Sequence, residues 1–263
     1  RSLSNLANLL CDNGDYEGAE PLNRRALAII ENVKGKDHLD TARCLNNFAG
    51  LFFKRGDYFV AEHHYRRALA IVEKVLGENH PNTAANLNNL ATVALKKGDY
   101  ASAEPLYRRA LEIYEKVLGQ KYPDIAHILN SIATLLFFRG DYLGAESFSR
   151  RALEIGEKVL GEEHPVTTQI FNNLESLLSK KGDYGNAEPL FRRVLAIREK
   201  VLGKEHPDTA TIVNNLGELL SRKGDYAGAE SLFRRAMEIR KNVLGKEHPD
   251  TAVSLNNLAG LLR

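Results

Sequence analysis

Histidine is the residue whose type and spacing in this chain most suggest chemistry. It recurs every 42 residues, with one tyrosine in the third copy, at His38, His80, Tyr122, His164, His206 and His248. Imidazole nitrogens bind zinc, but the ligand atoms must all lie about 2.0–2.1 Å from one metal ion. Equivalent positions in stacked helical units lie about 8–10 Å apart or more. We therefore expect turn residues that precede a proline, and no metal site.

The other candidate groups for catalysis or metal binding are few. His63 and His64 are adjacent, so on a helix they point in different directions and form a poor chelate; we expect them at the surface. Cys11 and Cys44 are the only cysteines. A disulfide between them stays open, but two thiols in 263 residues favour a reducing compartment such as the cytoplasm.

The chain carries no sequence motif of an enzyme. It has neither a phosphate-binding Gly-x-x-x-x-Gly-Lys-Ser/Thr loop nor a Gly-x-Ser-x-Gly nucleophile motif. Arginine pairs recur, but they stand four residues from glutamates, as in Glu104, Arg108, Glu112 and Lys116. Such pairs stabilise a solvated helix by about 0.2–0.5 kcal/mol each. We therefore expect a protein that is not an enzyme and needs no cofactor.

Composition and charge exclude two classes of partner. Lysine and arginine number 36 against 34 acidic residues, which leaves a formal net charge of +2 and no basic footprint for nucleic acid. No apolar run approaches the roughly 18 residues that span a bilayer, and no signal-peptide pattern opens the chain. We expect neither nucleic acid nor a membrane as a partner.

The dominant signal is an internal repeat of 42 residues. The tripeptide Gly-Asp-Tyr marks it at Gly14, Gly56, Gly98, Gly140, Gly182 and Gly224, with no insertion or deletion. A Leu-Gly pair follows on the same period, at Leu76, Leu118, Leu160, Leu202 and Leu244. Six copies at one spacing predict an array of like structural units. The chain starts and stops inside a repeat, so we expect it to be either an excerpt of a longer array or an artificially trimmed chain.

The repeat from Pro81 to Gly119 shows why each copy should form two helices. Pro81 suits the first turn of a helix. An apolar face with helical spacing follows, formed by Leu87, Leu90, Ala91, Ala94 and Leu95. Gly98 ends this first helix, because glycine adopts a left-handed conformation cheaply, and Asp99 is a good cap for the next. A second apolar stripe runs from Tyr100 to Leu118, and Gly119 stops it.

Helices joined by such short turns must pack antiparallel. Each helix of the repeat carries a small residue at one recurring position, which permits close approach. These residues are Ala49, Ala91, Ala133 and Ala259 in the first helix and Ala19, Ala61, Ala103, Ala145, Ala187 and Ala229 in the second. Stacked repeats then bury one continuous core. We predict an all-α solenoid over 1–263, as one domain rather than two. Its repeats span about 1–38, 39–80, 81–122, 123–164, 165–206 and 207–248, with a partial copy at 249–263.

The pattern resembles a tetratricopeptide repeat. The matching residues are Asn89-Leu90-Ala91, Gly98-Asp99-Tyr100, Ala103-Glu104 and Tyr107-Arg108-Arg109-Ala110-Leu111. The 42-residue period and the segment from His206 to Ala210 depart from the 34-residue form and resemble the longer repeats of kinesin light chain and related bacterial proteins. The resemblance implies a right-handed superhelix whose first helices line a concave groove that binds peptide segments.

The face of the first helix opposite its apolar arc carries a ladder of asparagines. It comprises Asn46 and Asn47, Asn88 and Asn89, Asn130 with Ser131, Asn172 and Asn173, Asn214 and Asn215, and Asn256 and Asn257. Asparagine is a mediocre helix former, yet its amide can donate and accept hydrogen bonds with a peptide main chain. We expect ligand contacts chiefly from Asn46, Asn88, Asn89, Asn130, Asn172, Asn214 and Asn256. The alternative is a bond to a neighbouring helix, which we expect for the second member of each pair.

Positions that vary between repeats should set specificity. Near the end of the first helix these are Phe53, Lys54, Leu95, Lys96, Phe137, Phe138, Lys180 and Arg222. They predict a peptide with a bulky apolar residue near acidic ones, similar to the acidic, aromatic-containing ligands of kinesin light chain. The alternative is that these phenylalanines pack at helix ends and the lysines are merely solvated.

Two functions remain at this point. The first is a non-catalytic scaffold that binds a peptide or linear motif of another protein. The second is a structural or engineered array that self-associates end to end, because terminal repeats without a polar cap expose apolar faces.

Overall fold

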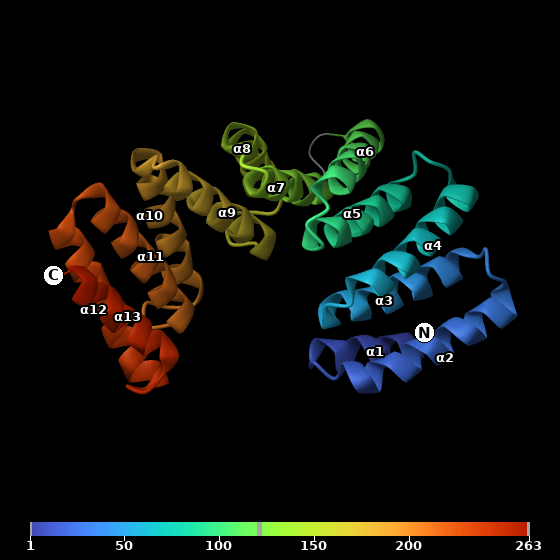
Figure 1. Cartoon of the computed structure of the whole chain (residues 1–263), viewed down its shortest axis with the longest axis horizontal. Helices are drawn as coiled ribbons and strands as arrows, with labels where there is room; N and C mark the ends of the chain where they lie inside the picture. Colours follow the sequence, from blue (N-terminus) through green and yellow to red (C-terminus); the bar gives the residue numbers. More distant parts are fainter. Residues whose placement is uncertain (1, 120–122, 262–263) are drawn as a thin grey trace. The chain divides into compact units, whose positions relative to one another are not determined.

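The computed structural model describes residues 2–119 and 123–261, which fold into helices joined by short turns (Figure 1). The first helices of the repeats are α1 (Ser2–Asp12), α3 (Leu39–Arg55), α5 (Pro81–Lys96), α7 (Pro123–Phe138), α9 (Pro165–Lys181), α11 (Pro207–Lys223) and α13 (Pro249–Leu261). The second helices are α2 (Tyr16–Lys34), α4 (Tyr58–Leu76), α6 (Tyr100–Leu118), α8 (Tyr142–Val159), α10 (Tyr184–Val201) and α12 (Tyr226–Leu244). None of these helices is long and apolar enough to cross a membrane.

The Gly-Asp pair makes the turn within each repeat, as predicted. Gly56 ends α3 in the left-handed conformation, at φ 86° and ψ 4°, and its N–H donates to the carbonyls of Phe52 and Phe53. Asp57 then caps α4, because its carboxylate accepts a hydrogen bond from the Val60 N–H at 3.3 Å. The same aspartate cap recurs at Asp15, Asp99, Asp141, Asp183 and Asp225.

The histidine row caps the first helices. In α5, Nδ1 of His80 accepts a hydrogen bond from the Asn82 N–H at 3.0 Å, while Pro81 occupies the first turn. Thr83 closes the turn by donating to the carbonyl of Gly77 at 2.8 Å. Equivalent caps form at His38, His164, His206 and His248. The expected turn residues therefore do more than precede a proline, because the unprotonated nitrogen satisfies a free N–H at the helix start.

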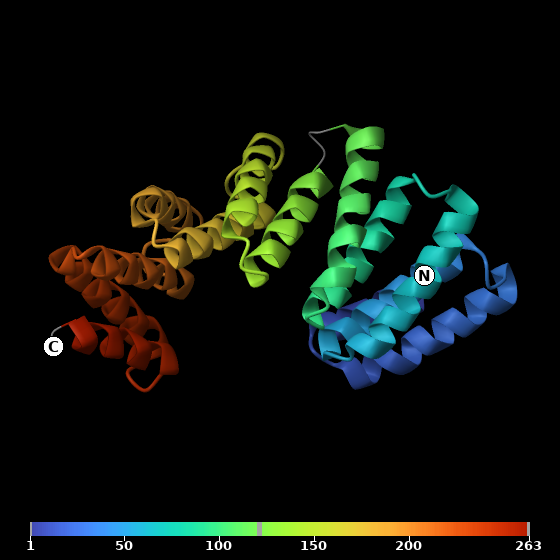
Figure 2. The ribbon, with the colours of Figure 1, turned by 45° about the horizontal axis from the view of Figure 1, so that its top comes forward.

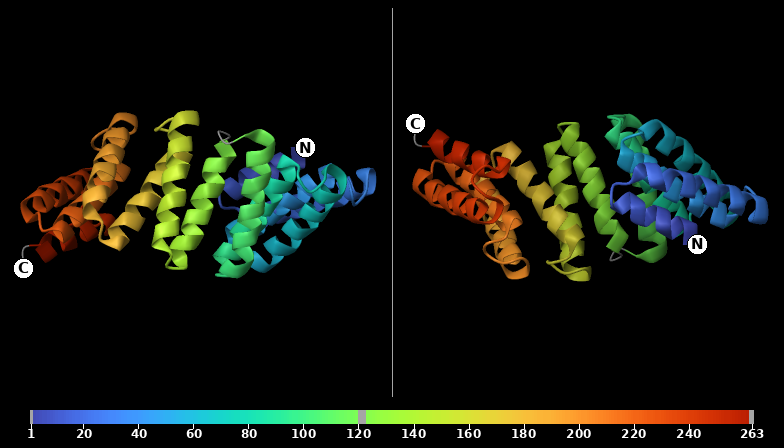
Figure 3. Two further views of the ribbon diagram at one scale, coloured as in Figure 1. Left: turned by 90° about the horizontal axis from the view of Figure 1, so that it is seen from above. Right: turned by 90° about the horizontal axis from the view of Figure 1, so that it is seen from below.

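The chain divides into two compact units, Arg1–Arg139 and Gly140–Arg263, which we call the N-terminal and C-terminal units. In the N-terminal unit each helix packs against its neighbours in sequence, from α1 to α7. The same order holds from α8 to α13 in the C-terminal unit. Figures 2 and 3 show the helix pairs of each unit. A single continuous solenoid over both units stays a prediction.

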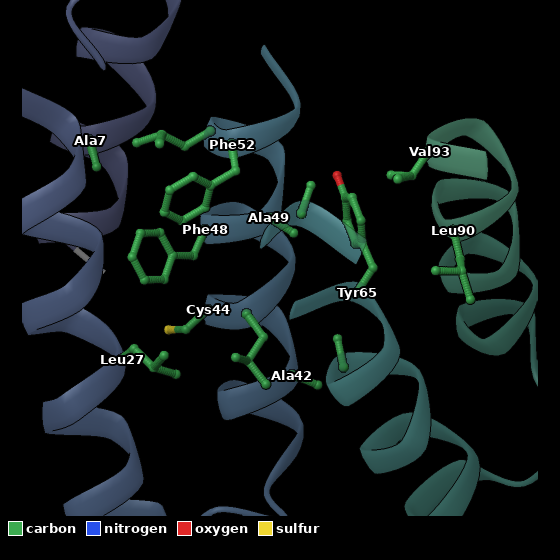
Figure 4. Close-up of a cluster of buried hydrophobic side chains, with 14 of the residues drawn as sticks. Ala7, Leu27, Ala42, Cys44, Phe48, Ala49, Phe52, Tyr65, Leu90 and Val93 are labelled. Carbon is green, nitrogen blue, oxygen red and sulfur yellow. The ribbon is translucent and has the colours of Figure 1, made fainter. Parts of the chain in front are cut away.

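The core of the N-terminal unit lies between successive helix layers (Figure 4). Phe48 and Phe52 of α3 point toward Ala7 and Leu27, whereas Tyr65 of α4 lies on the side of α5. Alanines with no exposed surface stand between the helices at Ala49, Ala61, Ala91 and Ala103. The predicted small-residue positions are confirmed there, because larger side chains would hold the helices apart.

The glutamate of each Ala-Glu pair links neighbouring repeats. Glu62 on α4 pairs with Arg66 one turn along its own helix and with Lys97, which follows α5, at 2.6 Å. The same double pairing occurs at Glu20, Glu104, Glu146 and Glu188. The predicted pairs between these glutamates and the arginine four residues later are confirmed. The ion pair between each of these glutamates and the next repeat was not predicted, because it depends on how the repeats stack.

Candidate functional site

The first helices form the more closely spaced layer of each unit. In the N-terminal unit α1 contacts α3 and α5 contacts α7, and in the C-terminal unit α11 contacts α13. Among the well-developed helix contacts of the described residues, none joins two second helices of one unit. Figure 1 shows α1, α3 and α5 on one side of the N-terminal unit and α2, α4 and α6 on the other. The exposed surface of this closer layer is called the first-helix face below.

The first members of the asparagine pairs differ in how deeply they are buried in the first-helix face. Asn130 and Asn214 are buried, at 5% and 3% exposed, whereas Asn256 is exposed. Half-buried members stand at Asn46, Asn88 and Asn172, and their amide oxygens are shielded and lack a hydrogen-bond partner among the described residues. Burial leaves Asn130 and Asn214 little surface to offer a ligand.

In every pair except Asn256 and Asn257, the second member is at least as exposed as the first. Asn215 is exposed, and half-buried side chains stand at Asn47, Asn89, Asn173 and Asn257. One member does bond a neighbouring helix as expected: Asn257 donates to Asn214 Oδ1 and to Glu218 Oε1, both at 3.0 Å. The Asn257–Asn214 hydrogen bond joins a second member to the first member of the preceding pair. First members are therefore not reserved for a ligand, nor second members for packing.

Two hollows open between first helices of the N-terminal unit, at equivalent positions one repeat apart. The hollow between α1 and α3 has a volume of about 600 Å³ and is lined by Ser4, Asn5 and Asn47 among others. The hollow between α3 and α5 has a volume of about 560 Å³ and includes Asn46. Arg43 lines both hollows. The asparagine ladder therefore borders concave surface in this unit.

The apolar candidates at the ends of the first helices differ in exposure. Phe138 is 59% exposed and stacks on Tyr100 with ring centroids 6.2 Å apart. Phe53 is half-buried and lies 5.6 Å from the Tyr58 ring. Leu95 and Phe137 are half-buried as well. Packing at helix ends thus accounts for much of the Phe53 surface, and Phe138 is the most accessible of the four.

The basic candidates also differ. Lys54 donates to Asp12 of the preceding repeat at 2.6 Å, and this hydrogen bond raises the pKa of Lys54. Exposed side chains without an ion pair to any described residue stand at Lys96, Lys180 and Arg222. The positive charge that remains free on this face therefore lies at Lys96 in one unit and at Lys180 and Arg222 in the other.

The repeats match a known family along most of the chain. A family model described as tetratricopeptide repeat matches residues 1–58, 45–116, 124–200, 176–242 and 208–263. The chain belongs to the tetratricopeptide repeat family. Comparison with curated proteins gives no match.

Several solved structures share the fold of this tetratricopeptide repeat protein. BtubC (BKLC) from P. vanneervenii is 26% identical, with a TM-score of 0.74 over 89% of this chain and 92% of that one. A putative kinesin light chain from Podosopora anserina is 23% identical, with a TM-score of 0.71 over 78% and 97%. The apo form of RapI is 17% identical, with a TM-score of 0.68 over 99% and 95%. The predicted solenoid of antiparallel helix pairs and its kinesin-light-chain-like repeats are confirmed.

One histidine of this tetratricopeptide repeat protein lies deeper than predicted. His63 is exposed as expected, but His64 is half-buried and stacks on Phe48 and Phe52, at 4.9 and 5.8 Å between centroids. Desolvation lowers the pKa of His64. A signal was available, because the equivalent position is apolar elsewhere, at Leu22, Leu106, Phe148, Leu190 and Leu232.

The two cysteines are free and buried. Burial raises the pKa of the Cys11 and Cys44 thiols. Since the thiolate is the reactive form, neither cysteine has the environment of a nucleophile or a redox centre.

Proposed function

We propose that this protein is a non-catalytic scaffold that binds a peptide segment of another protein along the first-helix face. Solenoids of this family typically mediate protein–protein interaction. The observation that carries the proposal is a row of partly or fully exposed amides on this face, at Asn5, Asn47 and Asn89 in the N-terminal unit. Two of them, Asn5 and Asn47, line the hollow between α1 and α3. These side chains stay open after packing has used the apolar face of each helix.

The chemistry of the row fits a peptide main chain. Each carboxamide offers two N–H donors and an acceptor oxygen, which match the carbonyl and N–H groups of an extended segment. Because main-chain recognition demands no particular side chain in the peptide, the asparagine row would supply affinity but no sequence specificity. Asn46 and Asn88 stand beside it, whereas the buried Asn130 and Asn214 contribute by holding the helices.

Sequence preference would come from the ends of the first helices. Phe138 offers exposed apolar surface to a bulky side chain, and the half-buried Leu95 and Phe137 offer less. The unpaired cations Lys96, Lys180 and Arg222 favour acidic residues in the same ligand. Lys54 contributes less, because Asp12 already neutralises it.

Paired substitutions test the scaffold role. A peptide selected from an array against the intact chain is titrated into the Asn47→Ala/Asn89→Ala variant by calorimetry. Loss of two hydrogen-bonding amides should weaken binding about 5- to 160-fold, at about 0.5–1.5 kcal/mol per bond. The matched control is Asn32→Ala/Asn242→Ala, which removes two exposed asparagines from second helices. Equal peptide affinity in both variants would exclude the first-helix face as the binding site.

A second candidate function is self-association through terminal helices. Leu6 and Leu9 on α1 are exposed, as are Val253 and Leu255 on α13. Static light scattering across a hundredfold range of concentration separates the two roles. Growth of mass with concentration that Leu9→Lys abolishes supports association, whereas a constant monomer mass rules it out.

A further inference from the structure

The hollow between α3 and α5 contains a buried asparagine that breaks the repeat. Asn86 lines this hollow and is 4% exposed. The equivalent position is apolar in three later repeats, at Ile128, Ile170 and Ile212. A polar group in place of a core isoleucine gains nothing for packing. Its presence therefore calls for a partner.

The Asn86 side chain is only half satisfied. Its Nδ2 donates to the carbonyl of Asn82 at 2.7 Å, which fixes which atom of the amide is the oxygen. Its Oδ1 is shielded and accepts no hydrogen bond from the described residues, and the same holds for Oδ1 of Asn46 in the same hollow. An unsatisfied buried polar group costs about 1–3 kcal/mol, so two acceptors on one hollow indicate a missing donor.

The charges around the hollow argue for a neutral donor. Asp40 is already paired with Arg43 at 2.7 Å and lies 3.9 Å from Lys34. His38 is unprotonated at Nδ1, because that atom accepts from the Asp40 N–H at 3.0 Å. A cationic ligand would therefore meet a neutralised carboxylate and a nearby excess of positive charge. An anionic ligand would face two unsatisfied oxygens.

We propose that this hollow binds the side-chain carboxamide of a glutamine or asparagine in the bound peptide. A primary amide has two N–H donors, one for each unsatisfied oxygen. The terminal torsion of an asparagine is soft, so Asn46 and Asn86 can turn their oxygens toward the ligand. Val72, Ala42 and Ala85 give the ligand's methylene groups an apolar wall. The inference rests on the proposed peptide-binding function.

Binding of a small probe to the intact chain tests the inference. The probe is N-acetylglutamine methylamide, with N-acetylnorleucine methylamide as its apolar counterpart, and the readout is the ¹⁵N shift of the asparagine side-chain amides. We expect saturable shifts with the glutamine probe alone. The Asn86→Ile variant carries the residue that later repeats have, so it should keep the fold and bind at least tenfold more weakly. If it does not fold, Asn86→Ser, which matches Ser254, takes its place.

The controls separate this inference from the wider function. The Asn47→Ala/Asn89→Ala variant leaves the hollow unchanged, so the probe should bind it as it binds the original chain. Equal response to both probes, or unchanged affinity in the Asn86 variant, overturns the inference. If peptides bind and the probe does not, the carboxamide site fails while the scaffold role stands. If the probe binds and no peptide does, the scaffold role fails instead.

Discussion

Glu175 occupies the position in α9 where the other described first helices carry alanine or glycine, as at Ala133 and Gly217. It is 3% exposed, and burial raises the pKa of its carboxyl to about 8. Its Oε1 has no hydrogen-bond partner among the described residues. The side chain is therefore held in its neutral form at neutral pH, at a cost to the fold.

Replacing Glu175 by alanine should stabilise the C-terminal unit at pH 7. The folded state holds a proton that the unfolded state releases above its ordinary value near 4.5, so stability falls as pH rises from there to about 8. The gain in Glu175→Ala is on the order of 3 kcal/mol at pH 7 and vanishes near pH 4. Urea unfolding from pH 4 to 9, with hydrogen exchange in α9 and α10, measures it. The exposed Glu112→Ala is the control, and parallel pH profiles would refute the account.

The burial of single residues was harder to predict from the sequence than their positions on a helix. The ladder of asparagines was visible, but the depth of Asn130 and Asn214 depends on the adjoining helices. Lys54 looked like a ligand contact because its partner Asp12 stands a full repeat earlier in the chain. His64 could have been placed, since leucine or phenylalanine fills its position in other repeats. Local sequence patterns determine the helix face on which a residue lies. Packing between repeats determines how much of its side chain stays exposed to solvent.

At the scale of the helix, the turns were the most predictable feature. Gly56 and Asp57 define the end of one helix and the start of the next from their own backbone and side-chain chemistry. The histidine cap was harder to foresee, because serine, threonine, asparagine and aspartate are the usual residues at that position. Helix bounds could thus be predicted from local signals, whereas the inter-repeat ion pairs could not.

Gly217 reveals how closely α11 approaches α12. A Cβ at this position would lie 2.8 Å from Cε1 of Phe233. We expect Gly217→Ala to lower the free energy of unfolding by about 1–3 kcal/mol, because the ring has to move in a packed core. The matched control is Gly185→Ala in α10, where a Cβ meets nothing within 4 Å and helix propensity should add stability. Thermal unfolding of both variants decides it; a stabilised Gly217→Ala would contradict the close approach.

At the scale of the molecule, each repeat is tied to the next by charge as well as by the core. Glu62 joins Arg66 and Lys97, and four other glutamates make the same pair of contacts. Because these groups are partly exposed, each pair contributes little alone. Their repetition nevertheless couples neighbouring repeats along both compact units.

The Glu62→Gln variant tests that coupling. It removes the charge shared by two repeats, so we expect a loss of about 0.5–1.5 kcal/mol at low salt and a smaller loss at 1 M salt. Urea unfolding at both salt concentrations measures the effect. Glu112 is exposed and makes no ion pair to another repeat among the residues that the structure describes. Glu112→Gln should therefore change stability by less at either concentration. Equal effects of the two substitutions would show that the inter-repeat arm adds nothing.

The turn chemistry recurs at one unvarying spacing, and this bears on how such a gene can grow. If a block of 42 residues were deleted or duplicated in frame, each new junction would still have a glycine turn followed by an aspartate cap. Every new junction would bring together residue types that already meet elsewhere in the chain. Recombination between copies would therefore lengthen or shorten the first-helix face by whole repeats, without a new kind of boundary between repeats.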